Sequence, residues 1–427
     1  MRIPTLRRLL PSPALARFAA SWGAWVTGES AALVVLSVVA YNEAGLGAVG
    51  VAGALRVLPA IVAAPWGAVL TDRFPRVRVL VSLHVLNALQ LAALSGVAVL
   101  HLPVPALYAV VLFSALLSAF VRPTTSALAT ELVDEPDELA GANALFSTME
   151  GAGTLLGPAF AALLLALAAP AVALTAIAML GVLGAVVTMC IRTKAPAPVD
   201  GTPHGHHGRD LTVGFEALLG EPRIAAIFGL ILAQSAMRGL LNVFVMAAAL
   251  SLLELGESGP GGLLSLIGLG GLLGSALSFG LAGGRRLALP FAAGVAAWGV
   301  AVLGMAAWPT PVVAWLTLAG LGLGNAIEDV AGLTLLHRLV PHLNLGRALG
   351  ALWGAAGASV AVGSLAAPGL IAVFGLRGAM AVSGATLVLL VIAAWGQVRH
   401  ADQSADGRGR TPPYVDTGSR SSAYAAA

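Results

Sequence analysis

Long apolar runs make up most of the chain, and short breaks rich in Gly, Pro or charged residues separate them. Many of the runs have about 20 residues, which is the length of helix that crosses a hydrocarbon core about 30 Å thick. The strands of a membrane β-barrel would instead alternate between apolar and polar residues over about ten positions. The pattern therefore predicts twelve membrane-spanning helices, centred near residues 30, 59, 89, 115, 152, 180, 238, 270, 297, 323, 360 and 386.

The composition agrees with a protein that is embedded in lipid. Hydrophobic residues make up 58% of the 427 positions and charged residues 10%, and the mean hydropathy is +0.91, whereas a soluble domain carries about 25% charged residues. The single cysteine, Cys190, excludes an internal disulfide and a metal site built from cysteines. An intramembrane enzyme would need paired His ligands on one helix or a Ser with a positioned base, and the sequence shows neither pattern. We therefore expect no enzymatic activity, no cofactor and no bound metal.

The two halves of the chain are related. The longest polar break divides the predicted spans into two sets of six. Residues 17–23 resemble residues 223–229 at an offset of 206, and residues 144–146 resemble residues 351–353 at an offset of 207. A nearly constant offset across several spans indicates a duplicated set of helices. The predicted fold class is an all-α integral membrane protein with two pseudo-symmetric six-helix bundles.

Five segments follow from these boundaries. They are a cytoplasmic leader at 1–13, an N-terminal bundle at 14–191, a cytoplasmic linker at 192–220, a C-terminal bundle at 221–398, and a disordered cytoplasmic tail at 399–427.

Basic residues set the predicted orientation, because cytoplasmic loops retain Lys and Arg. With the N-terminus inside, nearly all of the 23 Lys and Arg residues fall in cytoplasmic segments. The acidic loop from Glu131 to Glu138 falls there too, and acidic residues have little weight in this rule. Both termini are then cytoplasmic.

The heavy use of Ala, Gly, Leu, Val and Arg suggests a bacterium. We therefore expect a multi-pass protein of the inner (plasma) membrane. The net charge of +3 then reflects contact with the lipid bilayer, with no nucleic acid as a partner.

The loop after the second predicted span resembles a signature of the major facilitator superfamily. It runs from Gly67 to Arg78 and has Asp72, Arg73 and Arg76 at matching positions, and the resemblance extends over about residues 14–398. Ion pairs in such a cluster at a helix junction can form in one conformation and break in another. We therefore expect these three residues to act as a conformational gate. A solvated marker of topology is the alternative.

The fifth span carries a second motif. Gly153, Gly157 and Pro158 resemble the packing motif that the superfamily links to exporters, and residues 122–128 are similar to the branch that includes enterobactin and macrolide efflux proteins. The resemblance implies a monomeric secondary active transporter that exports a small molecule by alternating access, with protons moving inward in antiport. An uptake symporter or facilitator of the same fold, or a transport-silent membrane scaffold, is the alternative.

Charged residues inside the predicted spans point to a transport path. A charge at the bilayer centre costs at least about 2.5–3.5 kcal/mol, so it usually faces a bundle interior or water. The first, fourth, seventh and tenth spans carry Glu29, Arg122, Arg238, Glu328 and Asp329, and the resemblance implies that these four spans line a central cavity. We expect some of these side chains to contact substrate or protons. Alternatively, Arg122 snorkels to the membrane surface and the acidic pair holds helices together.

Glu29 is the first candidate for proton coupling, because apolar surroundings disfavour the ionised form of a carboxyl group. A structural carboxylate paired with an arginine is the alternative. Gln234, Arg238 and Asn242 are spaced by four and share one face of the seventh span. This face is suited to a polar or anionic substrate, or to hydrogen bonds across to the first span.

Overall fold

The computed structural model describes residues 12–133, 136–192, 207–278 and 286–408. Within these residues the chain forms α-helices and no strand. The helices of the N-terminal bundle are α2 (Pro13–Arg73), α3 (Arg76–Val99), α4 (Val104–Glu131), α5 (Pro136–Leu167) and α6 (Pro170–Met189).

The linker contributes α7 (His207–Leu219). The helices of the C-terminal bundle are α8 (Pro222–Ala247), which continues as the π-helical η1 (Ala248–Leu252), α9 (Gly259–Ser278), α10 (Ala288–Ala307), α11 (Pro311–Leu339) and α12 (His342–Arg408). Several begin with proline, which lacks the N–H that a first helical residue leaves unpaired and has a backbone angle suited to a helix. The all-α fold class predicted from the sequence is confirmed.

Two of the helices each cross the membrane twice. Ten helices among the described residues are long and apolar enough to span a membrane, but α2 has 61 residues and α12 has 67. A straight helix of that size would be roughly 90–100 Å long, about three times the thickness of the hydrocarbon core.

Non-helical backbone at Ala44 and Gly45 divides α2, and Gly375 divides α12. Both glycines have a positive φ, 69° and 68°, which costs glycine little and other residues more. Counting both halves of α2 and α12 gives the predicted twelve spans.

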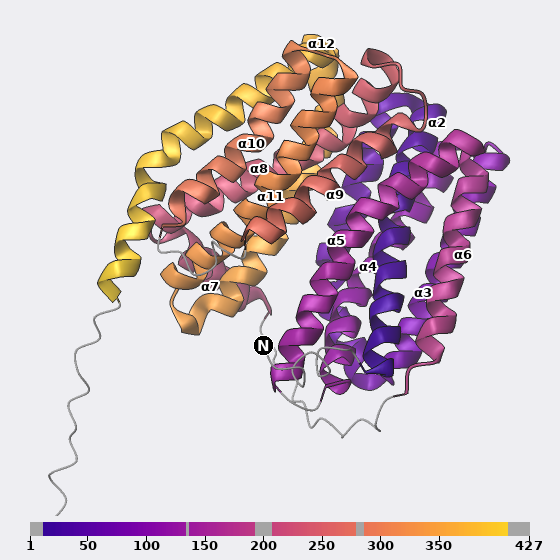
Figure 1. The fold of residues 1–427 in the computed structure, drawn as a ribbon, viewed down its shortest axis with the longest axis horizontal. Helices are drawn as coiled ribbons and strands as arrows, with labels where there is room; N and C mark the ends of the chain where they lie inside the picture. The colour runs from indigo at the N-terminus through magenta and orange to yellow at the C-terminus, as the bar shows by residue number, and fades with distance from the viewer. Residues whose placement is uncertain (1–11, 134–135, 193–206, 279–285, 409–427) are drawn as a thin grey trace, which may run out of the picture.

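The two bundles lie side by side (Figure 1). We call the end that carries α7 and the start of α2 the linker side, and the end that carries Gly45 and Gly375 the turn side. The ribbons of the two bundles approach each other on the turn side and diverge toward the linker side (Figure 1). Both ends of the described chain lie toward the linker side.

Glycine allows the bundles to touch on the turn side. A Cβ atom added to Gly50 of α2 would lie 2.5 Å from the carbonyl oxygen of Ser364 in α12, and one added to Gly268 of α9 would lie 2.5 Å from the Cα atom of Leu155 in α5. Small residues permit such close backbone approach, and packing of this kind drives helix association in lipid. One polar contact joins the bundles at the same end, where the Asn42 amide donates a hydrogen bond of 2.8 Å to Glu257.

The C-terminal end of α12 packs against α10. The helix continues to Arg408, past the predicted start of a disordered tail at 399. Val398 and Ala401 are buried, and the Asp402 carboxylate accepts hydrogen bonds of 2.8 and 3.2 Å from the backbone N–H groups of Leu287 and Ala288. A carboxylate at a helix N-terminus satisfies free N–H groups and the helix dipole, which explains why the chain stays helical here.

The predicted linker also contains ordered structure. Helix α7 lies against α12, where Gly214 meets the backbone of Arg347 and Leu218 is buried. The rings of Phe215 and Phe228 meet edge to face with centroids 6.3 Å apart. The linker is therefore held against the C-terminal bundle by apolar contacts.

Replacing Gly50 with Val is expected to separate the bundles on the turn side, because the added side chain would overlap Ser364. Overpacking of this kind costs about 1–3 kcal/mol, which shifts a two-state equilibrium roughly 5–150-fold. Pulsed electron resonance between spin labels at Ala44 and Glu254, in a Cys190→Ala background, measures the separation. Gly47→Val is the matched control, since a Cβ atom at Gly47 meets no atom within 4 Å. Equal distance distributions in the two variants would contradict the role given to Gly50.

Candidate functional site

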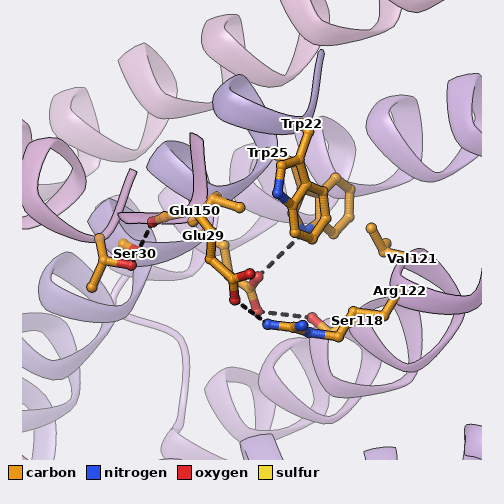
Figure 2. A pocket seen from close by; sticks show the side chains of 10 residues that line it. Trp22, Trp25, Glu29, Ser30, Ser118, Val121, Arg122 and Glu150 are labelled. Carbon is orange, nitrogen blue, oxygen red and sulfur yellow. Dashed lines mark hydrogen bonds and ion pairs between the residues drawn. The ribbon is translucent and has the colours of Figure 1, made fainter. Parts of the chain in front are cut away.

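A cavity of about 240 Å³ lies in the N-terminal bundle and is lined by α2, α4 and α5. Its lining includes Trp22, Trp25, Glu29, Arg122 and Glu150 (Figure 2). Residues three and four apart share one helix face, so the spacing of Trp22, Trp25 and Glu29 brings all three to the cavity side of α2. Two of the lining residues are sequence candidates, Glu29 and Arg122.

Glu29 is held by three neighbouring side chains. Arg56, in the second half of α2, forms an ion pair with it at 3.0 Å. Ser118 of α4 donates to the same carboxylate at 3.2 Å, and the Trp25 indole N–H, one turn away, donates at 3.2 Å (Figure 2). The Glu29 side chain is 34% exposed. This geometry matches the alternative of an Arg-paired carboxylate and also leaves the group in contact with the cavity.

A second ion pair crosses the cavity wall between Arg122 of α4 and Glu150 of α5. The Arg122 guanidinium also lies 5.9 Å from the centre of the Trp22 ring, a distance typical of a cation–π contact. The Phe146 ring stacks on Trp22, with the two centroids 4.9 Å apart. Arg122 therefore joins two helices, and its 71% exposed side chain does not pair with Asp329, its counterpart in the repeat, in this structure.

The C-terminal bundle carries its own polar group at α8 and α11. Arg238 donates to the Asn325 side-chain oxygen at 2.8 Å, and Gln234 donates to the same atom at 3.3 Å. The Asn325 amide in turn donates to Asp329 at 2.9 Å. Among the described residues, the hydrogen bonds of this group do not include Asn242, which is half-buried further along α8.

Glu328 points away from its exposed neighbour Asp329. Only 3% of Glu328 is exposed, because the side chain packs against α10, where Gly294 lies close to its Cβ atom. Its Oε2 atom has no hydrogen-bond partner among the described residues. Trp298, one turn beyond Gly294, also has a buried indole N–H without a described partner, and Arg238 lies over its ring at 5.3 Å.

The predicted gate is described in part. Arg76 forms an ion pair of 2.6 Å with Glu131 and donates to the Ala127 carbonyl at 3.2 Å, so it ties α3 to α4. The side chains of Asp72 and Arg73 lie outside the described residues.

The span-five motif contacts two different helices. A Cβ atom at Gly153 or Gly157 would overlap α2 near Val26 and Ser30. The carbonyl of Pro158 instead meets Gly261 of α9, across the interface between the bundles. No cluster of three or more His, Cys, Asp or Glu side chains suited to a metal ion occurs in the described part of the chain.

Sequence reasoning did not single out Arg56, Asn325 or Trp298 as site residues. Arg56 was detectable, because an arginine inside an apolar run follows the same rule that selected Glu29. Asn325 and Trp298 give no such signal, since a lone amide or indole is common in membrane helices and its partners depend on how the helices are rotated.

Twelve membrane helices in two related bundles, with charged groups embedded inside each bundle, are the architecture of a membrane transporter. A family model described as Major Facilitator Superfamily matches residues 14–328. The chain belongs to this family. No curated protein matches the chain in sequence.

Several solved structures share the fold. A point mutant of the nucleoside transporter NupG has a TM-score of 0.74 and 14% identity, with 90% of this chain and 99% of that chain covered. A peptide transporter, POT, in complex with sulfate has a TM-score of 0.71 and 15% identity, covering 92% and 95%. A bacterial homolog of the human lysosomal transporter Spinster, inward-facing and unoccupied, has a TM-score of 0.65 and 13% identity, covering 94% and 98%. At these identities the likeness concerns the fold alone.

Replacing Arg56 with Met is expected to lower the free energy of unfolding by about 1–3 kcal/mol, because Glu29 loses a charged partner while it stays half-buried. The double variant Arg56→Met with Glu29→Gln should regain part of that loss, since no charge is then left unpaired. Thermal unfolding in detergent, compared with Arg78→Met at an exposed position, measures both effects. Purely additive losses would show that the two side chains are not coupled.

Proposed function

We propose that the protein exports a small molecule by alternating access and that inward movement of protons drives the export. The observation that carries the proposal is a cavity bordered by Glu29, Arg122 and Glu150 in a molecule whose two bundles touch on the turn side. In a transporter, charges kept inside the membrane commonly serve substrate or proton pathways. We further propose that the linker side is cytoplasmic, in the inner membrane of a bacterium, because basic residues concentrate there.

Two features favour export over uptake. The packing motif Gly153, Gly157 and Pro158 resembles that of exporters, and its close contacts with α2 and α9 would place it where the bundles move against each other. The likeness of residues 122–128 to the enterobactin and macrolide efflux branch supports the same direction. We also propose that the protein works as a monomer, since each chain contains both bundles.

We place the candidate gate of this transporter on the linker side. We propose that Asp72, Arg73 and Arg76 stabilise the closed linker side and separate when it opens. The pair between Arg76 and Glu131 fixes the start of α3 beside α4 at this end of the bundle, so we propose that the contacts that separate involve Asp72 and Arg73. Ion pairs that water reaches contribute up to about 1 kcal/mol each, enough to bias two states without locking either.

Proton-coupled transport is testable in liposomes that contain the purified protein and a trapped pH indicator. With an imposed pH gradient, a panel of candidate compounds is expected to include cargo whose movement is accompanied by protons in the opposite direction. A variant with both Glu29→Gln and Glu328→Gln should keep its fold and lose this proton movement, because the two candidate proton carriers are neutralised.

Other outcomes separate the alternatives. Cargo and protons moving in the same direction would identify an uptake symporter, and cargo moving without protons would identify a facilitator. A folded protein that moves no cargo and no protons across a broad panel would favour a transport-silent scaffold and contradict the proposal.

A further inference from the structure

Charged side chains that lie well inside the described spans do not balance. Four are carboxylates and three are arginines, namely Glu29, Glu150, Glu328, Asp329, Arg56, Arg122 and Arg238. One carboxylate is therefore left without an arginine of its own.

The N-terminal bundle is balanced. Glu29 pairs with Arg56 at 3.0 Å, and Glu150 pairs with Arg122. Each carboxylate of this bundle therefore has an arginine as its neighbour.

The C-terminal bundle holds the excess. Its one arginine in this set, Arg238, is engaged by the Asn325 oxygen and the Trp298 ring. Asp329 is exposed and accepts a hydrogen bond from Asn325. Glu328 is buried and its Oε2 atom has no partner among the described residues.

The surroundings of Glu328 do not replace the missing cation. From α10 it faces Gly294, which has no side chain, with Trp298 one turn further on. The charged groups close enough to act on it are Asp329 on its own helix and Arg238 from α8. An ionised carboxylate in these surroundings is poorly stabilised. A bound proton neutralises the carboxylate and needs no additional room in the packed interior.

We infer that Glu328 carries the exchangeable proton and that the substrate that displaces it is an organic cation with a single positive charge. The inference rests on the proposed proton-coupled function. In the empty carrier the proton is bound to the Glu328 carboxyl group. When the cation arrives, the O–H bond breaks, water takes the proton as hydronium, and the carboxylate pairs with the cation. One positive charge replaces another, so the excess carboxylate is neutralised in both states.

Infrared spectroscopy of the purified protein tests the first part without a known substrate, because a protonated carboxyl group has a C=O band that an ionised one lacks. Near neutral pH the wild type should show this band, and Glu328→Gln should lose it. Glu29→Gln should retain it, as should the control Glu254→Gln, an exposed position. If Glu328→Gln does not fold, Glu328→Asp should keep a carboxyl band at a shifted frequency. A band that survives Glu328→Gln, or that disappears in Glu29→Gln, would overturn the assignment.

Probes of different charge test the charge of the substrate. Tetraphenylphosphonium and ethidium are permanent cations, tetraphenylborate is an anion, and triphenylphosphine oxide is neutral. Either cation should weaken the carboxyl band and release protons into a weakly buffered solution, and Glu328→Gln should release none. No effect of both cations, or an equal effect of the anion or neutral compound, would show that the substrate is not cationic.

The two proposals fail in different ways. Proton-coupled flux in liposomes that Glu328→Gln leaves unchanged would overturn the inference and leave the proposed function standing. A Glu328 band that responds to cations, in a protein that moves no protons across the membrane, would overturn the proposed function and leave a cation-binding site at Glu328.

Discussion

A polar group inside hydrocarbon has no water to bind, and this constraint accounts for most of the structure. Backbone groups satisfy one another within helices, and embedded charges find partners on neighbouring helices. Arg238 of α8, for example, donates to the side-chain oxygen of Asn325 in α11. The pair between Glu29 and Arg56 likewise joins the two spans of α2. Charged side chains therefore hold helices together in both bundles before any substrate is considered.

The contact between the bundles follows a different principle. Gly50, Gly261 and Gly268 bring backbone against backbone, so dispersion supplies much of the attraction. Such contacts are individually weak and do not leave a charge in hydrocarbon when they separate. Strong ion pairs lie within a bundle and weaker contacts lie between bundles, at least among the described residues. This division suits two rigid bodies that move against each other.

The sequence predicts the spans and the duplicated halves well, because apolar length is a property of each segment by itself. It also selects Glu29, Arg122 and Arg238 as embedded charges. It does not predict which side chains meet. Glu29 pairs with Arg56, which was not among the predicted site residues, because the turn at Gly45 folds the two halves of α2 back on each other. Helix rotation and tilt depend on packing against neighbours, and hydropathy carries little information about either. Helix α7 was missed for a related reason, since its stability comes from docking on α12.

The carboxylate of Asp402 gives the C-terminal segment a structural task. It caps the first turn of α10 from the C-terminal end of α12, so the ninth span depends on chain that is synthesised after it. Until α12 is complete, the first N–H groups of α10 must be satisfied by water. Assembly of the C-terminal bundle therefore finishes only when the last described turns of the protein have been made, and shortening the chain at residue 398 would leave the final closing contact of that bundle unformed.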